Sequence, residues 1–159
     1  MAKKEEKTNV MRLLDAAGLK YVMHSYDPDA AIAGKEVAAA LGEDPSAVFK
    51  TLVTTGRSGA HYVFMVPVDG ELDLRKAAKA AGEKSIEMLL SRELLPLTGY
   101  IHGGCSPIGM KKFFPTFIEE TAQLFDTVFF SAGKIGAQVE MAPADLEKAI
   151  PVTYADLCE

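Results

Sequence analysis

The chain has 159 residues, of which 48% are hydrophobic, and we expect a single domain over residues 1–159 because this length suits one hydrophobic core. Its formal net charge is −5, which excludes nucleic-acid binding through bulk electrostatics, since that mode needs many Lys and Arg residues against phosphate. The sequence has no apolar run of roughly 18 residues and no apolar stretch behind its charged start "MAKKEEKTNV", so neither a membrane helix nor a signal peptide is expected.

Hydrophobic spacing and breaker residues predict the elements in chain order. Residues 8–18 are predicted to form a helix with Thr8 as N-cap, Gly18 at its end, and a buried face made of Val10, Leu13, Leu14 and Ala17. Further helices are expected at 34–42, 73–82 and 144–150, and a helical turn at 91–95. Strands are expected at 21–27, 47–55, 60–68, 113–120, 126–133 and 137–143, and a short strand at 85–89.

The order of these elements indicates the fold class. Segments 47–55 and 60–68 are joined by "GRSG" and predict a hairpin. Strands outnumber helices in the second half, which differs from the regular strand–helix alternation of a doubly wound sheet. We therefore expect an α/β (α+β) domain with a mixed, mainly antiparallel, curved or barrel-like sheet and surrounding helices.

Lys50 is the most unusual residue of the apolar segment "VFKTLV". Alternation places it on the strand face shared with Val48 and Leu52, and a buried ammonium needs a partner or water. One interpretation is a cation directed into a pocket that accepts an anion. The other, which composition alone favours, is an edge or twisted strand from which Lys50 points to solvent.

The loop "YIHGGCSPIGMKK", residues 100–112, is rich in glycine. Gly103 and Gly104 lack Cβ atoms, so a ligand can approach the backbone closely, and successive N–H groups can bind an anion or an oxyanion. Pro107 would stiffen the far end of the loop. The alternative is a tight turn between strands. The loop matches neither a Walker pattern nor GxGxxG, so no dinucleotide site is indicated.

Cys105 follows His102 by three residues in this loop. A catalytic thiolate needs a cationic neighbour, and an inert loop cysteine is the commoner situation. Cys105 and Cys158 form no CxxC pair, which favours a reducing compartment such as the cytoplasm. Since no His, Cys or carboxylate cluster has metal-ligand spacing, we expect neither a metal nor a cofactor. A second turn of small residues, "SAGKIG", presents Lys134.

Four segments together closely resemble the YbaK/EbsC family, the free-standing relatives of the editing domain in bacterial prolyl-tRNA synthetases. They are "VFKTLV", "VPVDGELDLRKAAKAAG", "TGYIHGGCSPIGMKK" and "VFFSAGKIGAQVEMAPADL", and the resemblance runs unbroken from the first helix to about residue 150. It implies a YbaK-like fold and a deacylase that removes cysteine from Cys-tRNA(Pro) and Cys-tRNA(Cys). The partners would be the 3′ end of the aminoacyl-tRNA and, transiently, prolyl-tRNA synthetase, with no membrane involved.

The resemblance also implies a mechanism and a site. The thiol of the substrate would attack its own carbonyl, so the protein would position groups and stabilise charge. Lys50 would be catalytic, facing the terminal adenosine or the ester, where its charge binds phosphate or offsets the developing oxyanion. The substrate-binding residues would be Tyr26 at the adenosine end, Thr51 at the pocket wall, Gly103, Gly104 and Pro107 in the loop, Ser131 and Gly133 on the opposite wall, and Gln138.

Two departures from the family pattern leave the amino-acid preference open. Gln138 stands where relatives have an Asp, which removes a negative charge, and the segment "YDPDAAIAGKEV" is shorter, with Ile32 or Ala33 in place of an aromatic contact. Three alternatives to this function also remain open: a deacylase for another small amino acid such as alanine, a non-catalytic module that binds aminoacyl-adenosine or a nucleotide, and a thiol enzyme that uses Cys105.

Overall fold

The computed structural model describes residues 7–29 and 34–159. Its helices are α1 (Asn9–Ala16), α2 (Gly34–Leu41), α3 (Leu74–Ala81), α4 (Ser91–Thr98), α5 (Pro143–Ala149) and the 3-10 helix η1 (Glu120–Leu124). Its strands are β1 (Val22–Ser25), β2 (Phe49–Gly56), β3 (His61–Pro67), β4 (Ile86–Met88), β5 (Thr116–Glu119), β6 (Val128–Ser131), β7 (Ala137–Met141) and β8 (Thr153–Ala155).

The strands form two sheets. The larger has the order β4-β2-β3-β5-β8, and the smaller has the order β1-β7-β6. Pairing is antiparallel in the smaller sheet and between β2 and its neighbours β3 and β4, whereas β3–β5 and β5–β8 are parallel. The predicted mixed, mainly antiparallel sheet is therefore confirmed, but it is divided in two and does not close into a barrel.

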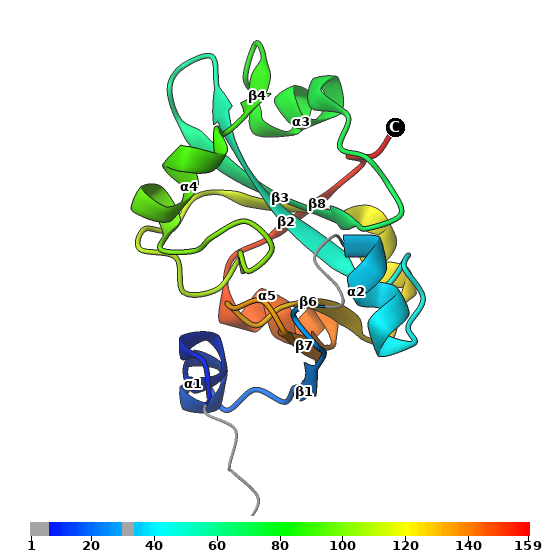
Figure 1. Cartoon of the computed structure of the whole chain (residues 1–159). Coiled ribbons are helices and arrows are strands. Elements are labelled where there is room, and N and C mark those ends of the chain that lie inside the picture. Colours follow the sequence, from blue (N-terminus) through cyan, green and yellow to red (C-terminus); the bar gives the residue numbers. More distant parts are fainter. Residues whose placement is uncertain (1–6, 30–33) are drawn as a thin grey trace, which may run out of the picture.

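A short bridge joins the two sheets at the start of β2. Val48 bridges to Phe129 of β6 in parallel, and the Phe129 N–H donates to the Ala47 carbonyl at 2.9 Å. In Figure 1, β2 and β3 cross the middle of the molecule, with α3, α4 and β4 at one end and α1, α5 and the smaller sheet at the other. The long β2 thus spans both halves of the described structure.

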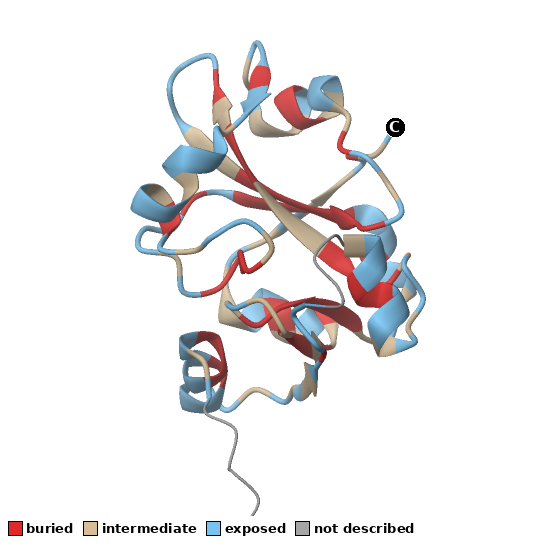
Figure 2. Ribbon diagram, in the orientation of Figure 1, coloured by how far each residue is buried: buried red, intermediate tan, exposed pale blue. Residues whose placement is uncertain are grey.

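The largest apolar cluster packs α1, α5 and β5 against the smaller sheet, and a second cluster packs α3 and the end of the chain against β3 and β5. Buried residues follow these central strands in Figure 2. The helix face predicted for α1 is partly wrong, because Val10, Met11 and Leu14 are buried whereas Leu13 is 44% exposed. The Thr8 hydroxyl accepts from the Met11 N–H and caps this helix as expected.

In the described part of the chain, no helix has both the length and the apolar character needed to cross a membrane.

Candidate functional site

A cavity of about 140 Å³ lies where β2, the smaller sheet, α2, α4 and the glycine loop meet. Val48 and the first four residues of β2, residues 49–52, all line it. Because side chains alternate between the faces of a strand, consecutive residues line one hollow only along the edge of the strand. Among the described residues, β4 pairs only with Thr54, Thr55 and Gly56 of β2, which leaves the edge of the earlier part of β2 facing the cavity.

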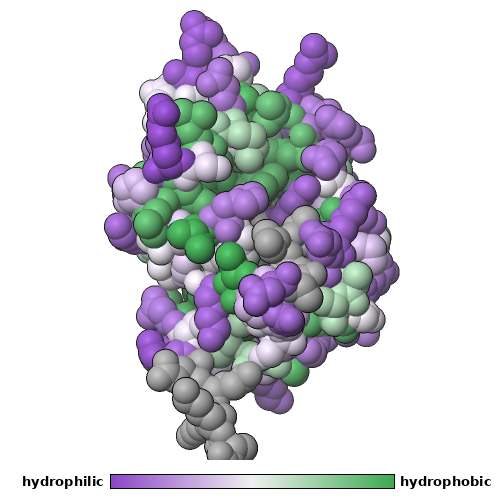
Figure 3. Space-filling view, viewed as in Figure 1, coloured by the Kyte–Doolittle hydropathy of each residue, from purple (hydrophilic) through white to green (hydrophobic). Residues whose placement is uncertain are grey.

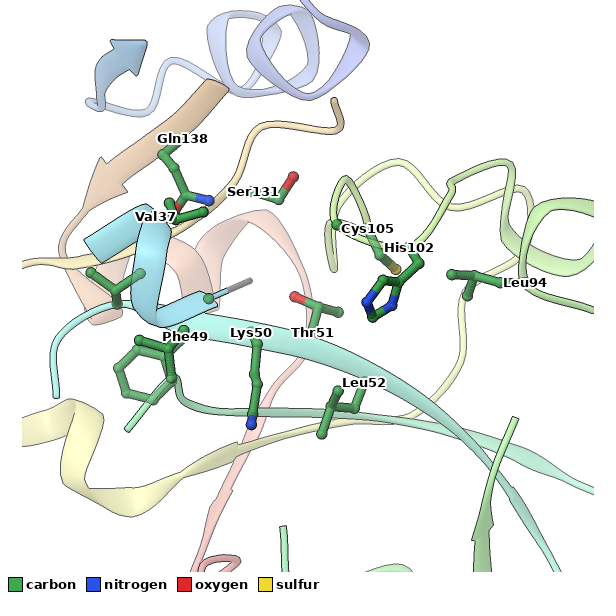
Figure 4. A pocket seen from close by; sticks show the side chains of 14 residues that line it. Val37, Phe49, Lys50, Thr51, Leu52, Leu94, His102, Cys105, Ser131 and Gln138 are labelled. Atoms are coloured by element: carbon green, nitrogen blue, oxygen red, sulfur yellow. The ribbon is translucent and has the colours of Figure 1, made fainter. Parts of the chain in front are cut away.

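The smaller sheet contributes a polar wall to this cavity. Gln138 of β7 lies opposite Ser131 of β6 on one side and opposite His24 of β1 on the other, so the three side chains share one face of the sheet. Ser131 and Gln138 line the cavity and are both buried. Figure 4 shows their side chains on the same side of β2 as Thr51.

Two oxygen atoms in this cavity have no hydrogen-bond partner among the described residues. They are Oγ1 of Thr51 and Oε1 of Gln138, and both are buried. An unpaired buried polar atom costs roughly 1–3 kcal/mol, so native structures rarely retain one without a reason. Two such atoms lining one hollow indicate a ligand that carries hydrogen-bonding groups.

The glycine loop closes the cavity and packs on the "SAGKIG" turn. Gly103 lines the cavity and has a φ of 88°, a conformation that L side chains rarely adopt. At Gly104, a Cβ atom would lie 3.1 Å from the Ile135 nitrogen and 3.2 Å from backbone atoms of Lys134. Gly104 therefore allows close contact between two backbones, which sets the position of the loop relative to Ser131.

Lys50 borders the cavity, but its ammonium points away from the glycine loop. In Figure 4, Lys50 and Leu52 extend from one side of β2, while Thr51 and the polar wall lie on the other. The Lys50 Nζ is 3.8 Å from Oε1 of Glu71, whose side chain is 77% exposed. Since such exposed pairs contribute little, the ammonium remains available to another anion.

Cys105 and His102 line the loop side of the cavity. Burial raises the pKa of the Cys105 thiol to about 12, so this thiol is protonated at neutral pH and is a poor nucleophile. Figure 4 shows the His102 imidazole on the loop side of the cavity. The residue is exposed, and its ring makes no hydrogen bond to any residue that the structure describes. In the described segments there is also no cluster of metal-ligating side chains.

The structure brings together part of the set of residues expected from the sequence. Lys50, Thr51, Gly103, Ser131 and Gln138 line this cavity. The other expected residues do not line it. Gly104 packs on the Lys134–Ile135 backbone, and Gly133 faces Val10 and Tyr100. Tyr26 and Pro107 line two separate hollows. Ile32 and Ala33 lie outside the described residues.

His102, Leu94 and Val37 also line the cavity, and they are not among the site residues expected from the sequence. For His102 a signal was present, since it precedes the two glycines directly. Leu94 and Val37 are ordinary apolar residues of α4 and α2, and their approach to the cavity depends on tertiary packing.

Comparison with known proteins assigns the family. Residues 27–149 match the family described as the aminoacyl-tRNA editing domain. The chain is 45% identical over 146 residues to EbsC of Enterococcus faecalis (strain ATCC 700802 / V583), covering 90% of this chain and 89% of EbsC, which has the provisional name Cys-tRNA(Pro)/Cys-tRNA(Cys) deacylase.

Solved structures agree. The hypothetical protein APE2540 superposes with a TM-score of 0.86 at 25% identity, over 94% of this chain and 99% of that one. A protein provisionally described as a trans-editing enzyme for prolyl tRNA synthetase superposes with a TM-score of 0.82 at 27% identity, over 97% and 99% of the two chains. The chain therefore belongs to the aminoacyl-tRNA editing domain family, as its resemblance to YbaK/EbsC proteins predicted.

Proposed function

We propose that this protein is a cytoplasmic trans-editing deacylase that removes cysteine from Cys-tRNA(Pro) and Cys-tRNA(Cys). Its family and the name of its Enterococcus relative support an editing reaction on aminoacyl-tRNA. The observation on which the proposal depends most is the small cavity whose wall holds two unpaired buried oxygens.

The size of the cavity suits an aminoacyl group and leaves the nucleoside outside. Its volume is about 140 Å³, and a protein cavity of about 150 Å³ holds one benzene molecule. Cysteine attached through its ester has a similar number of non-hydrogen atoms, whereas an adenosine is far larger. The ester bond therefore lies at the mouth of the cavity.

The polar wall suits the amino group of the substrate. Oε1 of Gln138 accepts a hydrogen bond, and the Thr51 hydroxyl donates or accepts one, so both pair with an α-amino group. Both oxygens are unpaired in the described structure, and a substrate that pairs with them removes their desolvation cost. Gly103 lines the loop side of the cavity, and its backbone N–H would bind the carbonyl oxygen.

The reaction that fits this cavity uses the thiol of the substrate as its nucleophile. The cysteinyl sulfur attacks the carbonyl carbon, the C–O bond to the ribose breaks, and a cyclic thiolactone and free tRNA result. Water then opens the thiolactone to cysteine. The protein supplies position and charge stabilisation, which agrees with the protonated state of its own Cys105 thiol.

The terminal nucleoside then lies on the apolar surface by the mouth. Leu52 and Leu94 border the cavity, and Figure 3 shows apolar surface across the region where Figure 1 places β2, β4 and α4. The Lys50 ammonium, directed outward from the cavity, is suited to the phosphate that precedes this nucleoside. Prolyl-tRNA synthetase would hold the rest of the tRNA transiently.

A deacylation panel tests the proposal. The substrates are Cys-tRNA(Pro), Cys-tRNA(Cys), Ala-tRNA(Pro) and Ser-tRNA(Pro), each with and without prolyl-tRNA synthetase, and the measurement is the rate of ester loss. We expect the two cysteinyl esters to be cleared at least about 100-fold faster than the others, because serine and alanine lack a thiol. Equal clearance of Ala-tRNA would refute the thiol-assisted reaction, and saturable binding without turnover would refute the enzyme.

A further inference from the structure

We propose that His102 is the proton carrier of this reaction, accepting the proton of the substrate thiol and returning it to the leaving ribose oxygen. The proposal rests on the deacylase function proposed above and adds a catalytic residue to it. His102 lines the loop side of the cavity as an exposed residue, and its ring makes no hydrogen bond to any of the described residues.

The reaction needs a group that accepts the proton of the substrate thiol. A cysteine thiol has a pKa of about 8.5, so only a few per cent of it is thiolate at pH 7. The leaving ribose oxygen needs a proton when the ester bond breaks. One side chain that exchanges protons near neutral pH performs both transfers, and histidine is the residue suited to this task.

The other ionisable groups that line the cavity among the described residues are unsuitable. Lys50 extends from the opposite side of β2 and lies near Glu71. Cys105 holds its proton, since burial raises its pKa to about 12. No carboxylate of the described residues lines this cavity.

Charged groups on the neighbouring elements do not replace His102. Lys134 is exposed on the turn that packs against Gly104, and it is a cation. On α4, Leu94 lines the cavity, while Arg92 and Glu93 border a separate hollow with His61.

The proton balance is complete. A nitrogen of the neutral His102 ring takes the S–H proton as the sulfur attacks the carbonyl carbon. The tetrahedral intermediate collapses, the C–O bond breaks, and the resulting imidazolium donates this proton to the ribose oxygen. The products are the thiolactone and the tRNA with a free terminal hydroxyl, and His102 returns to its neutral form.

The test measures kcat and KM for Cys-tRNA(Pro) between pH 5.5 and 8.5 in wild type and in His102→Gln. The glutamine retains much of the shape and hydrogen-bonding capacity of the imidazole but does not carry protons. We expect kcat to fall at least about 100-fold, as is usual on loss of a general acid–base group, with KM nearly unchanged and the pH dependence around neutrality removed. In His102→Ala, added imidazole should restore part of kcat.

His61→Gln is the matched control, because His61 is on β3 and borders a different hollow. It should keep the wild-type rate and pH profile. Wild-type activity together with an unchanged profile in His102→Gln would overturn the role of His102 while the deacylase proposal stands. An inactive wild type would instead overturn the proposed function. A lower rate in His102→Gln with the pH profile retained, and no imidazole rescue of His102→Ala, would also reject proton transfer by this residue.

Discussion

Thr51 and Thr54 lie on the same strand and differ in how their hydroxyls are paired. The Thr54 hydroxyl donates to the Tyr62 carbonyl at 3.0 Å, and the residue is fully buried. The buried Thr51 hydroxyl has no partner in the described structure. A hydroxyl that is paired within the fold and a hydroxyl that is left unpaired at the cavity are thus separated by two residues.

This difference predicts opposite effects of the same substitution. Thr51→Val should raise the free energy of unfolding by about 1 kcal/mol, because it removes an unsatisfied buried group. It should lower kcat/KM for Cys-tRNA(Pro) by roughly 3–10-fold, the value of one lost hydrogen bond. Urea unfolding and steady-state deacylation measure the two effects.

Thr54→Val is the internal control. It should lower stability by about 1 kcal/mol, since the hydrogen bond from the Thr54 hydroxyl to the Tyr62 carbonyl is lost, and it should leave kcat/KM near the wild-type value. The interpretation of Thr51 fails if its valine variant is destabilised and retains full activity.

Site residues could be predicted from the sequence where a short stretch of residues carries the signal by itself. Lys50 was visible as a charge in an apolar strand, and Gly103 as part of a diglycine, and both border the cavity. The sequence did not reveal that the Lys50 ammonium points away from the loop, because the direction of a side chain at a strand edge depends on which edge is open. The position of Tyr26 also depends on tertiary packing, since Tyr26 is buried in a cluster with Val37 of α2.

At the scale of elements, the helices and strands with clear periodicity were predicted correctly, and the errors have physical causes. The segment 91–95, expected as one turn, continues to Thr98 in α4 although it contains Pro96. β8 was missed because its pairing with β5 is parallel and joins residues far apart in the chain. Neither feature follows from local propensity.

Glu140 of β7 links elements on the outer part of the smaller sheet. Its carboxylate accepts from the Thr127 hydroxyl at 2.5 Å and lies 2.9 Å from Nε2 of His24 on β1. The hydrogen bond from Thr127, and to a lesser degree His24, lowers the pKa of Glu140 below its usual value. A carboxylate with a lowered pKa stabilises the fold above its unfolded pKa of about 4.3, and that contribution is lost as the pH falls through the lower folded value.

Glu140→Gln should therefore lower the urea midpoint at pH 7, by an amount that corresponds to about 1 kcal/mol. The difference in urea midpoint between Glu140→Gln and wild type should become smaller as the pH falls below about 4, where the wild-type carboxylate becomes protonated. Glu87→Gln, at an exposed position of β4, is the control and should match wild type at each pH. A constant difference between Glu140→Gln and wild type across this range would show that charge is not the cause.

At the scale of the whole molecule, the cavity depends on contacts between distant segments. It forms because the two sheets are joined through the short Val48–Phe129 bridge, beyond which the edge of β2 is left open toward the smaller sheet and the glycine loop. The sequence predicted the strands and the mixed topology. It did not predict that the strands form two sheets, since β2 and β6 are both apolar strands that would pair equally well in one continuous sheet.

The overall charge of the molecule limits how it recognises tRNA. With 17 Lys and Arg against 22 Asp and Glu, the protein has little general attraction for the phosphate backbone. Recognition by the isolated protein should therefore be confined to the 3′ end, where we propose that the cavity binds the amino acid and Lys50 binds a phosphate. In this respect the protein would differ from enzymes that bind the whole tRNA.

A comparison of full-length Cys-tRNA(Pro) with a cysteinylated acceptor-stem minihelix tests this expectation. Without the synthetase, kcat/KM should differ by less than about 3-fold between them, because contacts outside the 3′ end are few. Lys50→Ala should lower kcat/KM by roughly 10–100-fold on both substrates, the value of one charge-assisted hydrogen bond of about 1.5–3 kcal/mol. Lys79→Ala, at an exposed position of α3, should leave both values unchanged. A minihelix that is 100-fold poorer than tRNA, or tight and salt-dependent binding of uncharged tRNA, would show that the protein holds the tRNA body itself.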